Sequence, residues 1–201
     1  MREEYDIEKL NPRTNPYTEN DSEVNNQDQH QSSGKKQKNR TYMLTMRQSL
    51  SVKPRYDVYR DGMKVIYMID GDITRHVFTI RKDGIEVMTL RKKLVRLLPE
   101  YTLEKDGQEI AHIKKRISLL THDLSGTFGD QSVEIRPDWD AYRFDILVDG
   151  RKLCRIESKT ELLSDRYDIM MFDAGMEELA VALAVICDHV SDKKENARAN
   201  E

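Results

Sequence analysis

The sequence has little cysteine, no apolar run long enough to cross a membrane and no dominant charge. Its two cysteines, Cys154 and Cys187, are too few for a disulfide framework and lack the spacing of a metal site. Both lie in apolar segments, so we expect buried free thiols in a reducing compartment. Residues 1–20 contain no apolar stretch, and no run elsewhere reaches the roughly 20 residues that cross a bilayer. We therefore expect a cytoplasmic protein without a secretory signal or a transmembrane segment.

Signatures of catalysis and of nucleic-acid binding are missing as well. There is no glycine-rich phosphate loop, no Gly-x-Ser-x-Gly elbow, no paired histidines and no Cys-x-x-Cys. We expect a protein that is not an enzyme and holds neither a cofactor nor a metal ion. The formal net charge is −3, so no global field attracts nucleic acid. Between residues 90 and 120 the one aromatic is Tyr101, which leaves no stacking platform beside the basic residues and disfavours nucleic-acid binding.

The most informative stretch lies at residues 176–190. It contains nine consecutive apolar residues from Leu179 to Cys187, whereas a surface helix shows a polar residue every three or four positions. The length and the alanine content favour a helix over a buried strand. Asp173 is placed to cap it, and Glu177 stands in the first turn, where the helix dipole favours a carboxylate. The pattern predicts a helix surrounded by protein on all sides.

Composition divides the chain into three parts. Residues 1–40 hold six apolar residues and end in a basic stretch at 35–40. They have too little apolar surface to offset the entropy of ordering, so we expect a disordered polar tail. Residues 41–190 form the predicted domain. Residues 191–201 are polar, and we expect a fraying C-terminal tail.

Within the domain, Asp-Gly pairs recur between short β-rich segments, which is the strongest local signal for a hairpin. The pairs are Asp61-Gly62, Asp83-Gly84, Asp106-Gly107 and Asp149-Gly150. A regular period of this kind indicates one supersecondary unit used repeatedly. A degenerate unit, His122–Arg136, turns near Gly129-Asp130.

Loop length decides which residues of a hairpin share a face, because neighbours on a strand alternate between faces. A two-residue loop sets Phe144 against Arg155, whereas an odd loop gives all four hairpins an apolar face. The faces predicted from an odd loop are Tyr56 and Val58 with Ile66 and Met68; Phe78 and Ile80 with Met88 and Leu90; Tyr101 and Leu103 with Ala111 and Ile113; and Tyr142, Phe144 and Ile146 with Cys154 and Ile156.

Segments Tyr42–Arg47 and Arg166–Phe172 add the first and last strands. A sheet with one apolar face must cover that face or close upon itself. We therefore predict a mostly β fold, a closed antiparallel barrel of about twelve strands around the helix at 176–190.

This pattern resembles the LURP-one-related family over about residues 41–190. The features that carry the resemblance are the hairpins with basic strand ends (residues 91–94 and 114–117), the Asp138-Trp139-Asp140-Ala141-Tyr142 segment and the terminal helix that follows Asp173. The family is similar in fold to the tubby C-terminal domain and the phospholipid scramblases, so the resemblance implies a barrel around a central hydrophobic helix. For the tubby relatives it implies phosphoinositide binding at a basic surface.

Residues 91–116 contain eight basic and four acidic residues, a local net charge of +4. From the face assignment and this excess we predict a lipid-binding patch made of Arg91, Lys93, Arg96, Lys114 and Arg116. At about 1 kcal/mol per basic residue near an anionic membrane, four of them supply roughly 4 kcal/mol, which is near millimolar affinity.

Two hypotheses follow for the function. The first is a peripheral binding module for anionic membrane phospholipid, of the phosphoinositide type. The second is a soluble protein-interaction or scaffold domain with an unknown protein partner and no lipid role, in which the lysines only protect strand ends and keep the protein soluble.

Overall fold

The computed structural model describes residues 41–95, 98–115, 124–160 and 165–198. The predicted tail at residues 1–40 lies outside this range. Twelve strands, one short 3-10 helix (η1) and one long helix make up the described part: β1 Tyr42–Ser49, β2 Arg55–Arg60, β3 Lys64–Gly71, β4 Val77–Lys82, β5 Ile85–Val95, β6 Leu98–Lys105, β7 Gln108–Lys115, β8 Leu124–Phe128, β9 Gln131–Asp138, β10 Arg143–Val148, β11 Arg151–Thr160, β12 Asp165–Met171, η1 Ala174–Met176 and α1 Glu177–Arg198.

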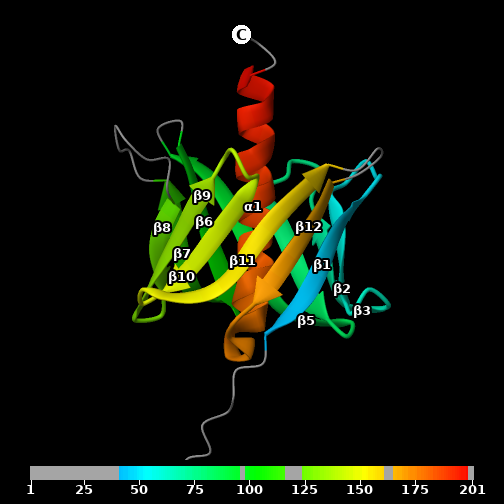
Figure 1. Ribbon diagram of the computed structural model, residues 1–201, viewed down its shortest axis with the longest axis horizontal. Coiled ribbons are helices and arrows are strands. Elements are labelled where there is room, and N and C mark those ends of the chain that lie inside the picture. The colour runs from blue at the N-terminus through cyan, green and yellow to red at the C-terminus, as the bar shows by residue number, and fades with distance from the viewer. Residues whose placement is uncertain (1–40, 96–97, 116–123, 161–164, 199–201) are drawn as a thin grey trace, which may run out of the picture. The chain divides into compact units, whose positions relative to one another are not determined.

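The strands form a closed barrel in which every strand is antiparallel to its neighbours in the chain (Figure 1). The ring closes where β1 pairs with β12, with Met43 opposite Met170 and Met46 opposite Tyr167. Closure leaves no free sheet edge, so every strand has a partner on both sides. The predicted closed antiparallel barrel of about twelve strands is confirmed.

The two ends of the barrel differ. The turn end carries the five hairpin turns, from Asp61-Gly62 to Asp149-Gly150, and α1 begins there. The opposite, loop end carries the connections that include residues 50–54 and 72–76. Both residues of each Asp-Gly pair have positive φ, for example 48° at Asp149 and 72° at Gly150, as a type I′ turn requires.

The predicted inward faces are confirmed in the second and third Asp-Gly hairpins and in most of the fourth. Ile80 lies opposite Met88, Leu103 opposite Ala111, and Ile146 opposite Cys154. In these three hairpins the odd count does not come from an odd loop. A two-residue turn is followed by a one-residue β-bulge, which gives the same parity.

Two predicted inward residues, Met68 and Tyr142, are wrong, whereas Ile66 is buried as predicted. In the first hairpin a three-residue loop and a bulge are both present, so Val58 lies opposite Tyr67 and Tyr56 opposite Ile69. The count is then even, and Tyr67 and Ile69 face the core in place of Met68. Tyr142 is 51% exposed because it stands in the turn before β10 with φ of 49°.

Helix α1 runs along the inside of the barrel (Figure 1). All nine residues from Leu179 to Cys187 are at most 2% exposed, which confirms the predicted enclosed helix. Asp173 caps the preceding turn, because its Oδ1 accepts a hydrogen bond from Gly175 N at 2.9 Å. The helix does not stop at Val190 as predicted but continues to Arg198, and its last turns extend past the loop end.

Close packing between strands makes one glycine necessary. A Cβ on Gly126 would lie 1.7 Å from the carbonyl oxygen of His112 on the neighbouring strand β7. We expect Gly126→Ala to lower the free energy of unfolding by about 1–3 kcal/mol, since rigid backbone must shift to make room. Urea unfolding checks this, with Gly175→Ala as the control because its Cβ would meet only the Asp173 side chain at 3.3 Å. Equal stabilities for the two variants would contradict the packing argument.

Candidate functional site

The described members of the predicted basic patch lie on the outer face of β5 and β7, toward the loop end. Lys93 and Lys114 are exposed, and both are register partners of Glu100 on β6, which lies between them. Directly opposed residues on neighbouring strands have Cβ atoms about 5 Å apart, so the three side chains form one row. Arg96 and Arg116 lie outside the described residues.

Acidic residues on β6 and β7 reduce the charge of this face. Arg91 Nε donates to both carboxylate oxygens of Glu104, at 2.9 and 2.8 Å. His112 lies 3.5 Å from Glu100. Sequence counting treats these charges as independent, whereas the pairing of β5 with β6 brings Arg91 and Glu104 together. Among the described members of the patch, Lys93 and Lys114 therefore present the exposed positive charge.

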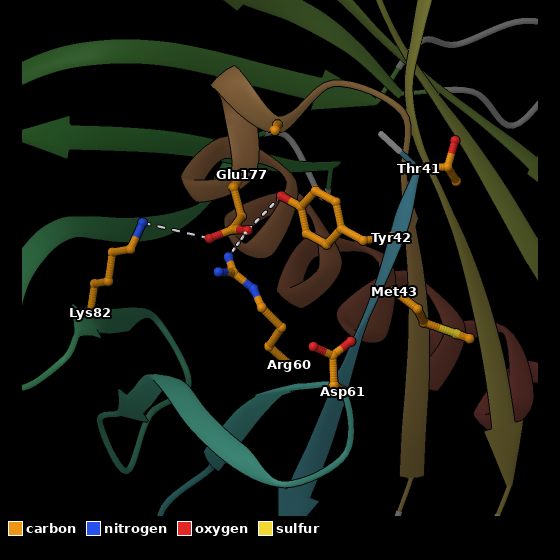
Figure 2. A pocket seen from close by; sticks show the side chains of 8 residues that line it. Thr41, Tyr42, Met43, Arg60, Asp61, Lys82 and Glu177 are labelled. Carbon is orange, nitrogen blue, oxygen red and sulfur yellow. Dashed lines mark hydrogen bonds and ion pairs between the residues drawn. The ribbon is translucent and has the colours of Figure 1, made fainter. Parts of the chain in front are cut away.

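A pocket lies at the turn end, where α1 begins. It is an open pocket of about 700 Å³ whose lining includes Tyr42, Arg60, Asp61, Lys82 and Glu177. Figure 2 shows the side chains of Tyr42, Arg60 and Lys82 converging on the carboxylate of Glu177. Sequence reasoning assigned Glu177 only to the first turn of the helix and missed this cluster.

Glu177 is buried and is bound on several sides. Its Oε2 accepts hydrogen bonds from the Tyr42 hydroxyl and from Arg60, both at 2.5 Å, and its Oε1 accepts from the Tyr67 hydroxyl at 2.8 Å. Lys82 Nζ lies 3.5 Å from Oε1. Burial alone would raise the pKa of Glu177, but the two tyrosine hydrogen bonds and the Arg60 charge outweigh it and hold the pKa below its usual value.

The cations of this pocket are engaged within the protein. Arg60 stacks over the Tyr42 ring at 5.4 Å and Lys82 over the Tyr67 ring at 5.1 Å, while both pair with Glu177. An incoming anion would have to compete with a buried carboxylate for the same two charges. The arrangement is best suited to anchoring the start of α1 between β1, β2, β3 and β4.

A similar anchor stands near the other end of the barrel interior. Asp188 is buried, and its two carboxylate oxygens accept hydrogen bonds from Tyr56 and Tyr167, each at 2.6 Å. Burial raises the pKa of Asp188, and the tyrosine hydrogen bonds offset only part of that rise. Two carboxylates, each held by two tyrosines, thus fix the rotation and the depth of α1. The sequence signal for such anchors is an acidic residue near each end of the apolar run, together with tyrosines at inward positions of the strands.

The family model of the LURP-one-related proteins matches residues 41–188, which span β1 to Asp188 of α1. The chain belongs to the LURP-one-related family. The resemblance noted in the sequence is thereby confirmed, together with the barrel around a central helix that it implied. A search of curated proteins found no match.

The cysteines of this LURP-one-related domain are free and buried, as predicted. Burial raises the pKa of both thiols, so neither forms a thiolate at neutral pH. In the described part of the chain, no three His, Cys, Asp or Glu side chains gather in a group able to hold a metal ion. The helices described here include none with the length and apolar character of a membrane span.

Proposed function

We propose that this LURP-one-related domain is a binding module that docks on anionic phospholipid head groups through the basic face of β5 and β7. The observation that carries the proposal is the pair of exposed lysines, Lys93 and Lys114, side by side with Glu100 on the outer face. Lysine ammonium groups at this exposure keep their donors for phosphate oxygens.

The charge of the two ends supports this location for docking. At the turn end, an aspartate stands in each Asp-Gly turn, and two cations of the pocket, Arg60 and Lys82, are bound to Glu177. An anionic surface would be repelled by that row of carboxylates. The outer face of β5 and β7 near the loop end carries Lys93 and Lys114 and lies at the opposite end of these strands from the turn aspartates.

The energy available from the two lysines is small. At about 1 kcal/mol per basic residue near an anionic surface, they contribute roughly 2 kcal/mol. The patch predicted from the sequence also contains Arg96 and Arg116, and two more basic residues raise the attraction to roughly 4 kcal/mol. Electrostatic attraction of this size gives reversible association, and a stable complex needs a further contribution.

We expect the double variant Lys93→Gln/Lys114→Gln to bind anionic vesicles roughly 30-fold more weakly than the wild type, since about 2 kcal/mol is lost. Co-sedimentation with phosphatidylcholine vesicles, with and without phosphatidylserine or a phosphoinositide, measures the effect. The matched control is Lys64→Gln/Lys105→Gln, which removes two exposed lysines that pair with Asp83 and Glu178 at the turn end. The control should bind as the wild type does.

Two outcomes would overturn the proposal. One is equal binding to neutral and anionic vesicles, and the other is an equal effect of the two double variants. Absence of vesicle binding, combined with capture of a defined protein that is lost in Lys93→Gln/Lys114→Gln, would favour the second hypothesis, a protein-interaction module using the same face.

A further inference from the structure

We infer that the connections β1–β2 and β3–β4 insert apolar side chains into the interfacial layer of the membrane, beside the basic face. This inference rests on the proposed function and adds the apolar contribution that the lysines lack. It assigns a membrane-contact role to Leu50, Val52 and Ile73. The barrel is then oriented with its loop end tilted toward the lipid on the side formed by strands β1 to β7.

The first argument is exposure. Leu50 is 77% exposed, Val52 91% and Ile73 69%. Single exposed apolar residues are common on protein surfaces, but apolar residues that gather with a polar rim mark interaction sites. Here three large aliphatic side chains occupy the tips of two connections where polar turn residues are the ordinary choice.

The second argument is that the two connections are neighbours. Gly71 N donates to Pro54 O at 2.8 Å, which joins the end of β3 to the segment that carries Leu50 and Val52. A Cβ on Gly71 would lie only 2.5 Å from Pro54 Cγ. The close approach brings the Leu50–Val52 tip and the Ile73 tip to one region of the loop end.

The third argument is the order of the β3–β4 tip. Asp72 Oδ1 accepts hydrogen bonds from His76 N at 2.8 Å and Val77 N at 3.2 Å, and Asp72 O accepts from Arg75 N at 3.1 Å. Thr74 donates to the other carboxylate oxygen. These bonds hold the turn closed while Ile73 projects from it. An ordered tip enters the interface without a further entropic cost of ordering.

The fourth argument is charge around the tips. Lys53 and Arg75 are exposed in the same two connections, and the one carboxylate there, Asp72, accepts hydrogen bonds inside its own turn. His76 O accepts from Lys92 N at 2.7 Å, which ties the β3–β4 tip to the strand that carries Lys93. Apolar tips with cations beside them fit the boundary between acyl chains and anionic head groups.

The path of α1 limits the orientation. Its last turns extend past the loop end, so the whole rim cannot lie flat on a surface (Figure 1). The tips of β1–β4 and the basic face of β5–β7 lie on consecutive strands of the ring. Tilting the barrel toward these strands brings both to the membrane and leaves α1 to one side.

Site-specific fluorescence tests the inference. Cys154 and Cys187 are buried, so a cysteine introduced at an exposed position of the folded protein takes a polarity-sensitive nitrobenzoxadiazole label selectively. Val52→Cys reports on the proposed tip. Met63→Cys is the matched control, because Met63 is 87% exposed but lies at the turn end. With vesicles of phosphatidylcholine and phosphatidylserine, we expect a blue shift and brighter emission at position 52 and no change at 63.

A triple variant gives an independent readout. Leu50→Ser/Val52→Ser/Ile73→Ser keeps every charge and should lower the affinity for anionic vesicles roughly tenfold or more, since the apolar contacts are lost. The thermal transition should stay at the wild-type temperature, because all three side chains are exposed.

The outcomes separate this inference from the proposed function. Anionic vesicles that bind the protein without changing the label at position 52, or that affect positions 52 and 63 alike, overturn the insertion and leave head-group recognition in place. A protein that fails to bind anionic vesicles overturns both. Binding with a response confined to position 52 and weakened by the triple variant supports both.

Discussion

Leu183→Asp is expected to abolish cooperative folding. Leu183 is fully buried at the centre of the run of nine enclosed residues of α1. Loss of the leucine side chain alone costs about 2–5 kcal/mol at such a site. The introduced carboxylate adds the cost of an unpaired buried charge. Together these terms approach or exceed a typical net stability of about 5–15 kcal/mol.

The measurement is urea or thermal unfolding followed by circular dichroism. Ile85→Asp is the control because Ile85 is 72% exposed at the start of β5, next to a hairpin turn, and it should change stability by less than about 0.5 kcal/mol. Leu183→Ala should fold with an intermediate loss of about 2–5 kcal/mol. A Leu183→Asp protein that keeps a cooperative transition would show that the barrel does not depend on a dry, packed helix.

The second large effect is expected at the carboxylate that anchors the start of α1. Glu177→Ala removes the acceptor of the buried Tyr67 hydroxyl, of the Tyr42 hydroxyl and of Arg60. Each buried polar group that loses its partner costs about 1–3 kcal/mol, and the ion pairs with the partly exposed Arg60 and Lys82 count for less because water screens them. We expect a loss of about 2–4 kcal/mol in the free energy of unfolding.

The neighbouring residue provides a matched control. Glu178 pairs with Lys105 at 3.5 Å across a partly exposed surface, so Glu178→Ala should cost at most about 1 kcal/mol. Both substitutions remove one carboxylate from the first turn of the same helix. Equal losses in chemical denaturation would mean that Glu177 acts only through the helix dipole, and that its tyrosine partners contribute nothing.

The stability conferred by Glu177 is expected to depend on pH. Because its pKa lies below the usual value in the folded protein, its contribution is complete above the unfolded pKa of about 4.3 and is lost as the pH falls through the folded pKa. The stability gap between wild type and Glu177→Gln should therefore shrink on acidification. Burial raises the pKa of Asp188, so the effect of Asp188 on stability changes with pH in the opposite direction. The difference in unfolding free energy between the wild type and Glu177→Gln isolates the contribution of Glu177, because Asp188 is present in both proteins.

Several elements were predictable because local pattern and tertiary packing agree. The run from Leu179 to Cys187 has no polar face, and its length and alanine content favoured an enclosed helix over a buried strand. A type I′ hairpin turn requires positive φ at both central positions, and Asp-Gly pairs adopt that conformation readily. In the first hairpin the same reasoning failed, because its loop has three residues and the bulge that all four hairpins share makes the total even. Neither the loop length nor the bulge leaves a reliable mark in the sequence.

The candidate sites were less predictable. The excess of basic residues between 91 and 116 can be counted in the sequence, but cross-strand partners decide how much of this positive charge remains unpaired. Arg91, for example, forms an ion pair with Glu104. The tyrosine and carboxylate anchors join residues more than 100 positions apart, such as Tyr42 and Glu177. Sequence patterning reports on neighbours along the chain, and these contacts form only when the ring closes around α1.

The sequence by itself determined the repeated hairpins, the family and the buried helix, because turn chemistry and hydrophobic periodicity act over a few residues. The tertiary structure alone decided which charges pair across strands, how α1 is held at both ends, and which apolar tips stay outside. Those features depend on register and on closure of the barrel, where a one-residue bulge moves a side chain from one face to the other.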